Sequence, residues 1–348
     1  MNDKEFDYSI AFMKAFLSFC VILCHYWSTS HGGYPISALY RIKTVAVLIF
    51  FIISFHLTKN MFAEGNIGKF KKRVWRLIFP YICWAIIYYI VYKFIDWILK
   101  CFVWNDGLQI ELSYRDLLWQ VALGSDRNLC PPLWYQFDLI LLTILIWIVF
   151  AYTKKYAWNV IIILMITAYA FQYSGLNYML FGPFEYEMRY PLGRFVEAIP
   201  LACMGLLVAN LFNLKKLREQ RLFVLFICLS SMILISYLEL FTTPENSFYY
   251  AGTYKAIYAT LAFLFFYVIP FEKAPLFIKK SLMYLSKYSL GVFCMHFGVG
   301  FLWNRILCRT FGIRENTFVE CIAIYIICIL LSWSISKCPL KNVRLLIQ

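Results

Sequence analysis

Two ionisable side chains lie in an apolar stretch near the start of the chain, MKAFLSFCVILCHYW over residues 13–27. In a helix, the eleven residues from Lys14 to His25 make about three turns, so both side chains lie on nearly the same face, about 16 Å apart along the axis. Ionisable groups inside a membrane are costly and normally face a partner, a cavity or water. Their shared face suggests a shared cavity, in which His25, with an ordinary imidazole pKa of about 6.5, is a candidate general base. Lys14 is a second candidate catalytic residue, which could bind a carbonyl or a phosphate or hold an internal hydrogen-bond network.

The same two residues also fit a purely structural role. Lys14 lies close enough to one end of the stretch to extend its ammonium group to the lipid headgroups. His25 is followed by Tyr26 and Trp27, and these three rings fit an interfacial aromatic belt. Both interpretations stay open on this stretch alone.

Two arginines form a second candidate group, in KFKKRVWRLIFP over residues 69–80. Arg73 and Arg76 are three residues apart, so a helix places them on one face, where two guanidinium groups can grip phosphate oxygens. The lysines beside them also fit ordinary positive flanking charge at the end of a membrane span.

Further candidates lie toward the expected outer side. His296 is a second possible acid or base. Glu187 and Arg189 could hydrogen-bond a glycan or a carboxylate, although their loop also has the composition of an ordinary solvated connection. Cys101 and Cys130 could pair in an oxidising compartment. There is no CxxC motif and no Cys/His cluster with zinc spacing, so we expect no metal site.

The composition indicates a membrane protein. Hydrophobic residues make up 62% of the chain, the mean hydropathy is +0.67, and charged residues make up 15%, against about 25% in soluble domains. The net charge of +14 is spread between apolar runs rather than gathered on a basic face, so we expect no nucleic-acid partner. The sequence predicts an all-α polytopic membrane protein within a lipid bilayer.

Apolar runs long enough to cross a bilayer predict about ten transmembrane helices in one domain over residues 1–348. They are expected near 8–27, 44–62, 74–99, 132–152, 157–173, 191–212, 222–242, 251–270, 282–304 and 317–336. The polar stretch 100–131 is expected to carry a helix on the membrane surface. With both termini in the cytoplasm, the inside segments hold 20 Lys and Arg residues and the outside segments hold 11, as the positive-inside rule requires.

These motifs together resemble the acyltransferase 3 family of membrane acyltransferases. In that family the first span carries a cation, ten residues and a histidine, here Lys14 and His25, and an RxxR lies at the start of the third span, here Arg73 and Arg76. The remaining matches are looser: FFxxSG in the second span, here FFIISF with Ser54; LWFL after the first large outer loop, here LWYQ with Trp134; and YxxH in the ninth span, here FCMH with His296.

The resemblance implies transfer of an acyl group, commonly acetyl from cytosolic acetyl-CoA, to a hydroxyl of a glycan or lipid-linked acceptor. No permanently bound cofactor is implied, and the family is commonest in bacterial cytoplasmic membranes. His25 would be the base, Arg73 and Arg76 would bind the donor, and Trp134 could stack on a sugar. Ser54 could form an acyl-enzyme, although direct transfer is favoured because no Ser/His/acid order is evident. The alternative function, a secondary transporter of a small polar solute, would more often show paired halves with broken helices, which the sequence lacks.

Overall fold

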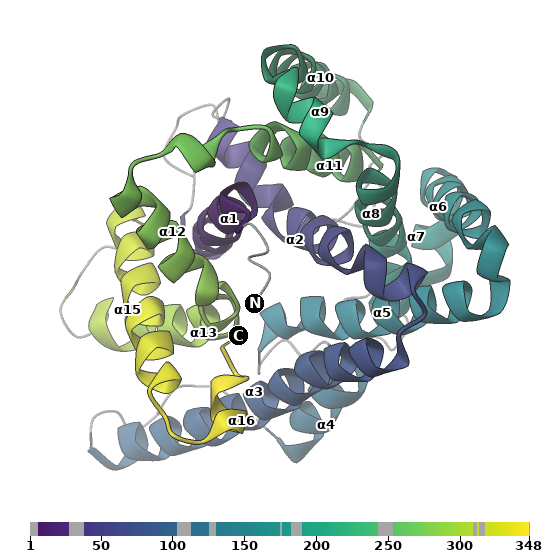
Figure 1. The fold of residues 1–348 in the computed structure, drawn as a ribbon. Coiled ribbons are helices and arrows are strands. Elements are labelled where there is room, and N and C mark those ends of the chain that lie inside the picture. The colour runs from purple at the N-terminus through teal and green to yellow at the C-terminus, as the bar shows by residue number, and fades with distance from the viewer. Residues whose placement is uncertain are drawn as a thin grey trace. The chain divides into compact units, whose positions relative to one another are not determined.

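The computed structural model describes residues 6–27, 38–102, 113–124, 130–174, 176–181, 190–242, 253–308, 312 and 317–347 (Figure 1). Helices, without any strand, form the regular structure of these residues. The chain divides into two compact units. Unit 1 comprises residues 1–17, 36–72 and 141–286, and unit 2 comprises residues 18–35, 73–140 and 287–348.

Eight stretches of the described chain are long and apolar enough to cross a membrane. They are Tyr8–Tyr26, Ile42–Ala63, Ile67–Cys101, Trp134–Tyr173, Pro191–Leu211, Arg221–Leu238, Tyr254–Lys273 and Phe318–Ser336. Trp134–Tyr173 holds two helices, α5 (Trp134–Thr153) and α6 (Ala157–Tyr173), while α13 (Ser289–Leu302) is apolar but shorter. An apolar helix thus stands at each place where the sequence predicts a span, and the all-α polytopic fold is confirmed.

Two helices differ most from the predicted spans. The third span belongs to α3 (Ile67–Phe102), which begins well before the predicted residue 74 and therefore carries the whole basic segment as helix. At 36 residues α3 is about 54 Å long, more than a hydrocarbon core of about 30 Å requires. The ninth predicted span, 282–304, is split between α12 (Leu276–Lys287) and α13. The lysines of α12 make it amphipathic, so the apolar helix starts only at Ser289.

Unit 1 is built around α2 (Ala38–Ala63), which packs against α8 (Tyr190–Leu211) and α11 (Thr253–Tyr267). Helix α6 packs on α8, and α10 (Arg221–Thr242) packs on α11, as Figure 1 shows. Pro200 lies inside α8 and has no N–H, so the carbonyl group of Val196 lacks its usual donor. Gln172 of α6 supplies one, with its Nε2 3.3 Å from that oxygen, and so joins the two helices.

The segment before α1 (Tyr8–Tyr26) is tied down in unit 1 by one arginine. Arg218 of α9 (Leu214–Glu219) lies 3.1 Å from Asp7 Oδ2 and 2.9 Å from Glu272 Oε1. Its guanidinium group also lies over the ring of Tyr267, 4.5 Å from the ring centre. Arg218 therefore joins the start of α1 to α9 and to the connection after α11.

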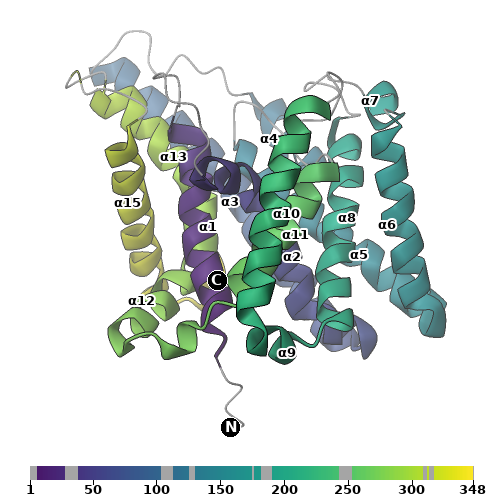
Figure 2. The ribbon, with the colours of Figure 1, turned by 90° about the horizontal axis from the view of Figure 1, so that it is seen from above.

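Unit 2 packs α13 against α15 (Phe318–Ser336), the two helices seen side by side in Figure 2. The segment after α16 (Lys341–Arg344) folds back into this unit, where Ile347 is fully buried. Trp84 of α3 fixes it, since the indole N–H donates to the carbonyl oxygen of Leu346 at 2.9 Å. The end of the described chain therefore packs beside α3.

Side-chain caps mark the starts of two helices, α4 and α15. Helix α4 (Tyr114–Leu123) starts with a capping box, in which Ser113 and Asp116 each accept from the other's backbone N–H. The same arrangement of Thr317 and Glu320 starts α15. Helix α4 lies within the polar stretch where the sequence predicts a surface helix; its location on the membrane surface stays a prediction.

We predict that both termini lie on the cytoplasmic side, because 20 Lys and Arg residues are in the expected inside segments and 11 in the outside ones. Tags at the two ends should react with membrane-impermeant reagents only after the cells are opened. Labelling of either tag in intact cells would contradict this orientation.

Candidate active site

Two histidines from distant parts of the sequence meet in unit 2. His25 lies in the last turn of α1 and His296 in the middle of α13, with their ring centres 5.2 Å apart. The two differ in accessibility: His25 is exposed, whereas His296 is fully buried. Of the two imidazoles, His25 is therefore the one that a ligand can reach.

Hydrogen bonding determines which nitrogen of His296 carries the proton. Its Nδ1 lies 2.7 Å from the carbonyl oxygen of Phe293 and 3.3 Å from that of Val292. Carbonyl oxygens only accept, so Nδ1 is the protonated nitrogen and Nε2 keeps its lone pair in the neutral ring. Nε2 is buried, and no described group of the chain hydrogen-bonds to it.

Two tyrosines hold the turn of α13 that carries His296. Tyr88 of α3 inserts its hydroxyl into the helical ladder, donating to the carbonyl oxygen of Cys294 at 2.6 Å and accepting from the N–H of Gly298 at 3.0 Å. A regular α-helix would join those two backbone groups directly. Tyr26 of α1 donates to the carbonyl oxygen of Phe297 at 2.9 Å. This turn is therefore held by side chains of α1 and α3, and a π-helix (Trp303–Cys308) follows α13.

Two glycines make room for these rings. A Cβ atom at Gly298 would lie 2.8 Å from the Tyr88 ring, and one at Gly300 would lie 2.2 Å from the Tyr26 ring. Both distances are far below normal contact, so only glycine allows the tyrosines to approach the backbone of α13 this closely.

We predict that Gly300→Ala displaces Tyr26 and with it the end of α1 that carries His25. The free energy of unfolding should fall by about 1–3 kcal/mol, as for an overpacked core, and any reaction that uses His25 should be slower. Thermal unfolding in detergent and a turnover assay measure the two effects. The matched control is Gly68→Ala, because an added Cβ there has ordinary contact at 3.4 Å. Equal stability of Gly300→Ala and the unaltered chain would contradict the packing described here.

The arginine pair lies at the start of the α3 segment in unit 2. Arg73 is half-buried and Arg76 is exposed, and the two are close enough to interact electrostatically. Arg73 also interacts with the phenol of Tyr135 at the start of α5. Pro80, inside α3, leaves the carbonyl group of Arg76 without its usual donor. Two cations, a phenol and a carbonyl group without its helical donor could hold a polyanionic, hydrogen-bonding ligand.

The other predicted site residues are distributed as follows. Trp134 is half-buried at the start of α5 in unit 2, and the ring of the adjacent Tyr135 packs edge-on against Phe293 of α13 at 5.1 Å. Lys14 and Ser54 are half-buried in unit 1, and Lys14 shares α1 with His25. Glu187 and Arg189 lie outside the described residues. Cys101 and Cys130 both have free thiols, the first exposed and the second buried.

Sequence reasoning missed the residues on one face of α3. Tyr81, Trp84, Tyr88 and Tyr92 are all buried and recur every three or four residues, from the Arg73 end of the helix toward α13. That spacing was visible in the sequence as an aromatic stripe. It marks a buried face but does not show that one hydroxyl enters another helix.

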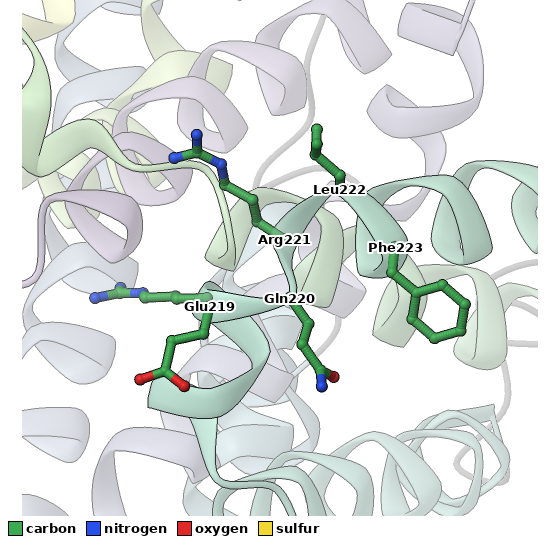
Figure 3. Close-up of a pocket in the computed structure, with 6 residues that line it drawn as sticks. Glu219, Gln220, Arg221, Leu222 and Phe223 are labelled. Carbon is green, nitrogen blue, oxygen red and sulfur yellow. The ribbon is translucent and has the colours of Figure 1, made fainter.

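A surface cavity of about 720 Å³ lies elsewhere, in unit 1 where α9 ends and α10 begins (Figure 3). Residues 218–223 line it, with the charged Glu219 and Arg221 beside the apolar Leu222 and Phe223. Leu222 is 76% exposed and Phe223 is 64% exposed, as expected of side chains that face lipid at the end of a span. None of the predicted site residues lines this cavity, so we assign it no part in catalysis.

A family model described as an acyltransferase domain matches residues 7–337, nearly the whole chain. No curated protein and no solved structure matches the chain. The matched region contains both histidines, the arginine pair and all the spans, so the resemblance found in the motifs is confirmed. The chain belongs to the acyltransferase 3 family and is a multi-pass membrane acyltransferase.

Proposed function

We propose that this acyltransferase moves an acetyl group from cytosolic acetyl-CoA to a hydroxyl of a cell-envelope glycan or glycolipid at a bacterial cytoplasmic membrane. The observation that carries the proposal is that one compact unit, unit 2, contains both an accessible imidazole on α1 and a pair of guanidinium groups on α3. These are a base for a hydroxyl and a binding group for phosphates.

The arginine pair suits the donor. Coenzyme A is polyanionic, and guanidinium groups make forked, charge-assisted hydrogen bonds to phosphate oxygens. Arg73 and Arg76 lie at the end of α3 that the positive-inside rule assigns to the cytoplasm. The thin pantetheine arm would then extend along the bundle toward the histidines, with the acceptor entering from the outer side.

His25 suits the acceptor. In its neutral form, one ring nitrogen takes the proton of the acceptor hydroxyl while the hydroxyl oxygen attacks the thioester carbonyl carbon. The carbon–sulfur bond breaks as the tetrahedral intermediate collapses, and the leaving thiolate takes up a proton to give coenzyme A. Lys14 would stabilise negative charge or hold the hydrogen-bond network of α1. Direct transfer is proposed rather than an acyl-enzyme on Ser54, because the sequence shows no Ser/His/acid order that would activate a serine nucleophile.

The test is acyl transfer by the purified chain in detergent, with radiolabelled acetyl-CoA and envelope extracts fractionated into polysaccharide, lipid-linked oligosaccharide and peptidoglycan. Label should enter one fraction and be released as acetate by mild base, as an ester requires. Label that resists mild base would show an amide product. Absence of label from every fraction, with a chain that is folded by thermal unfolding, would remove acetyl-CoA or these acceptors from the proposal.

A further inference from the structure

One buried nitrogen in unit 2, Nε2 of His296, can accept a hydrogen bond but has no donor among the described groups. His296 is fully buried, its Nδ1 proton is used by the carbonyl oxygen of Phe293, and its Nε2 has no hydrogen bond from any described group. A buried acceptor without a donor costs about 1–3 kcal/mol, so such a group calls for an explanation. The nearby ring of His25 offers the donor.

We propose that Nε2 of His296 accepts a hydrogen bond from one ring nitrogen of His25 during the reaction, and that Tyr88 is the positioning residue that holds His296 in place. His296 would thereby keep the other nitrogen of His25 unprotonated and directed at the acceptor hydroxyl. This inference rests on the proposed function for its catalytic consequence, but not for its geometry.

The distance between the rings supports the proposal. A hydrogen-bonded N···N pair at about 2.9 Å places two imidazole centres roughly 5 Å apart when the rings point at each other. His25 and His296 are 5.2 Å apart, with their planes tilted by 38°. No hydrogen bond joins the two rings in the described structure, so a rotation of the exposed His25 ring would align them. Catalytic hydrogen bonds are often poorly aligned before the substrate binds.

Accessibility decides which histidine meets the substrate. A hydroxyl has one proton to donate, so it cannot donate to both imidazoles at once. His25 is exposed and His296 is not, so the acceptor hydroxyl donates to His25. His296 is left to act through His25. When His25 takes the proton it becomes an imidazolium, and its hydrogen bond to His296 becomes charge-assisted and stronger. The proton stays on His25 until the leaving thiolate removes it.

Tyr88 supplies the positioning. Its hydroxyl lies between the backbone groups of Cys294 and Gly298, which bracket His296 in the sequence. Tyr88→Phe would remove both hydrogen bonds and leave the turn that carries His296 free to shift relative to His25. Tyr92→Phe is the matched control, because Tyr92 is also buried on α3 but its hydroxyl has no hydrogen-bond partner among the described groups.

The test that needs no substrate is ¹⁵N spectroscopy of the full chain, labelled only at histidine, in a lipid nanodisc. The chain has four histidines, so single replacements assign every imidazole signal. We expect His296 to show a protonated Nδ1 and an unprotonated Nε2. The Nε2 signal should shift in His25→Ala and in Tyr88→Phe, and stay unchanged in Tyr92→Phe. His56, which packs on Phe263 and Tyr267 in unit 1, reports in each variant that the chain is folded.

The kinetic arm separates this inference from the proposed function. His296→Leu should lower kcat roughly ten- to a hundred-fold, the factor for one charge-assisted hydrogen bond, and leave the acceptor KM unchanged. His296→Gln should recover part of the loss, because its amide oxygen can accept. A protonated Nε2 in His296, or an Nε2 signal that does not shift in His25→Ala, would overturn the inference even if His25→Ala were inactive. Full turnover by His25→Ala would instead overturn the proposed function.

Discussion

His25→Ala should reduce acyl transfer by roughly a hundred- to ten-thousand-fold, the usual contribution of a general base. The loss should appear in kcat, because the variant keeps the arginine pair that binds the donor. His25 is exposed at the end of α1, so its removal should not impair folding. Initial rates of transfer at saturating donor, together with thermal unfolding, measure both expectations.

The matched control is His56→Ala. His56 is also an imidazole on an apolar helix, but it packs on two aromatic rings in unit 1 and carries no role in the proposed reaction. It should retain turnover in proportion to the folded protein recovered. Near-normal turnover by His25→Ala would remove this residue from the mechanism and with it the base in unit 2.

Arg73→Ala should weaken binding of acetyl-CoA by roughly ten- to a hundred-fold, as expected for one charge-assisted hydrogen bond to phosphate. Arg76 is exposed, and solvent screens its charge, so Arg76→Ala should fall at the lower end of that range. Arg→Lys should restore only part of the affinity, because an ammonium group cannot make a forked contact. The apparent acceptor affinity should barely change in either variant.

Donor titration at fixed ionic strength measures this effect, and Lys72→Ala is the control. Lys72 is exposed in the same turn of α3, and its replacement by alanine removes the same charge. A general electrostatic effect would therefore weaken donor binding as much in Lys72→Ala as in the arginine variants. A donor analogue that lacks the 3′-phosphate shows whether that group is the contact. Unchanged donor affinity in both arginine variants would leave the pair as topology signals alone.

The helices of this protein could be predicted because lipid imposes a simple requirement. A span needs about twenty apolar residues, and its backbone must bond within itself, so apolar runs such as 318–336 read directly as helices. Helix ends were harder. The basic residues that precede residue 74 suggested an end to the third span, yet Lys, Arg and Phe are compatible with helix and α3 continues back to Ile67.

The candidate residues could be predicted from the sequence, but the contacts between them could not. An imidazole in an apolar stretch stands out wherever it occurs, so His25 and His296 were both found. Their approach depends on the last turn of α1 contacting α13, where Tyr26 and Phe297 are 271 residues apart in the sequence, and no periodicity encodes that contact. The glycines of HFGVG, residues 296–300, carry no such signal in the sequence; in the structure they are the positions where Tyr88 and Tyr26 reach the backbone.

The most direct test of the central claim uses the purified chain in vesicles of known orientation, with radiolabelled acetyl-CoA supplied on one side and the acceptor fraction on the other. We predict that mild-base-labile acetyl label enters the acceptor only when the donor is on the side of Arg73 and Arg76, the expected cytoplasmic side, and that His25→Ala abolishes this transfer. Labelling that requires donor and acceptor on the same side, or that persists in His25→Ala, would contradict the account.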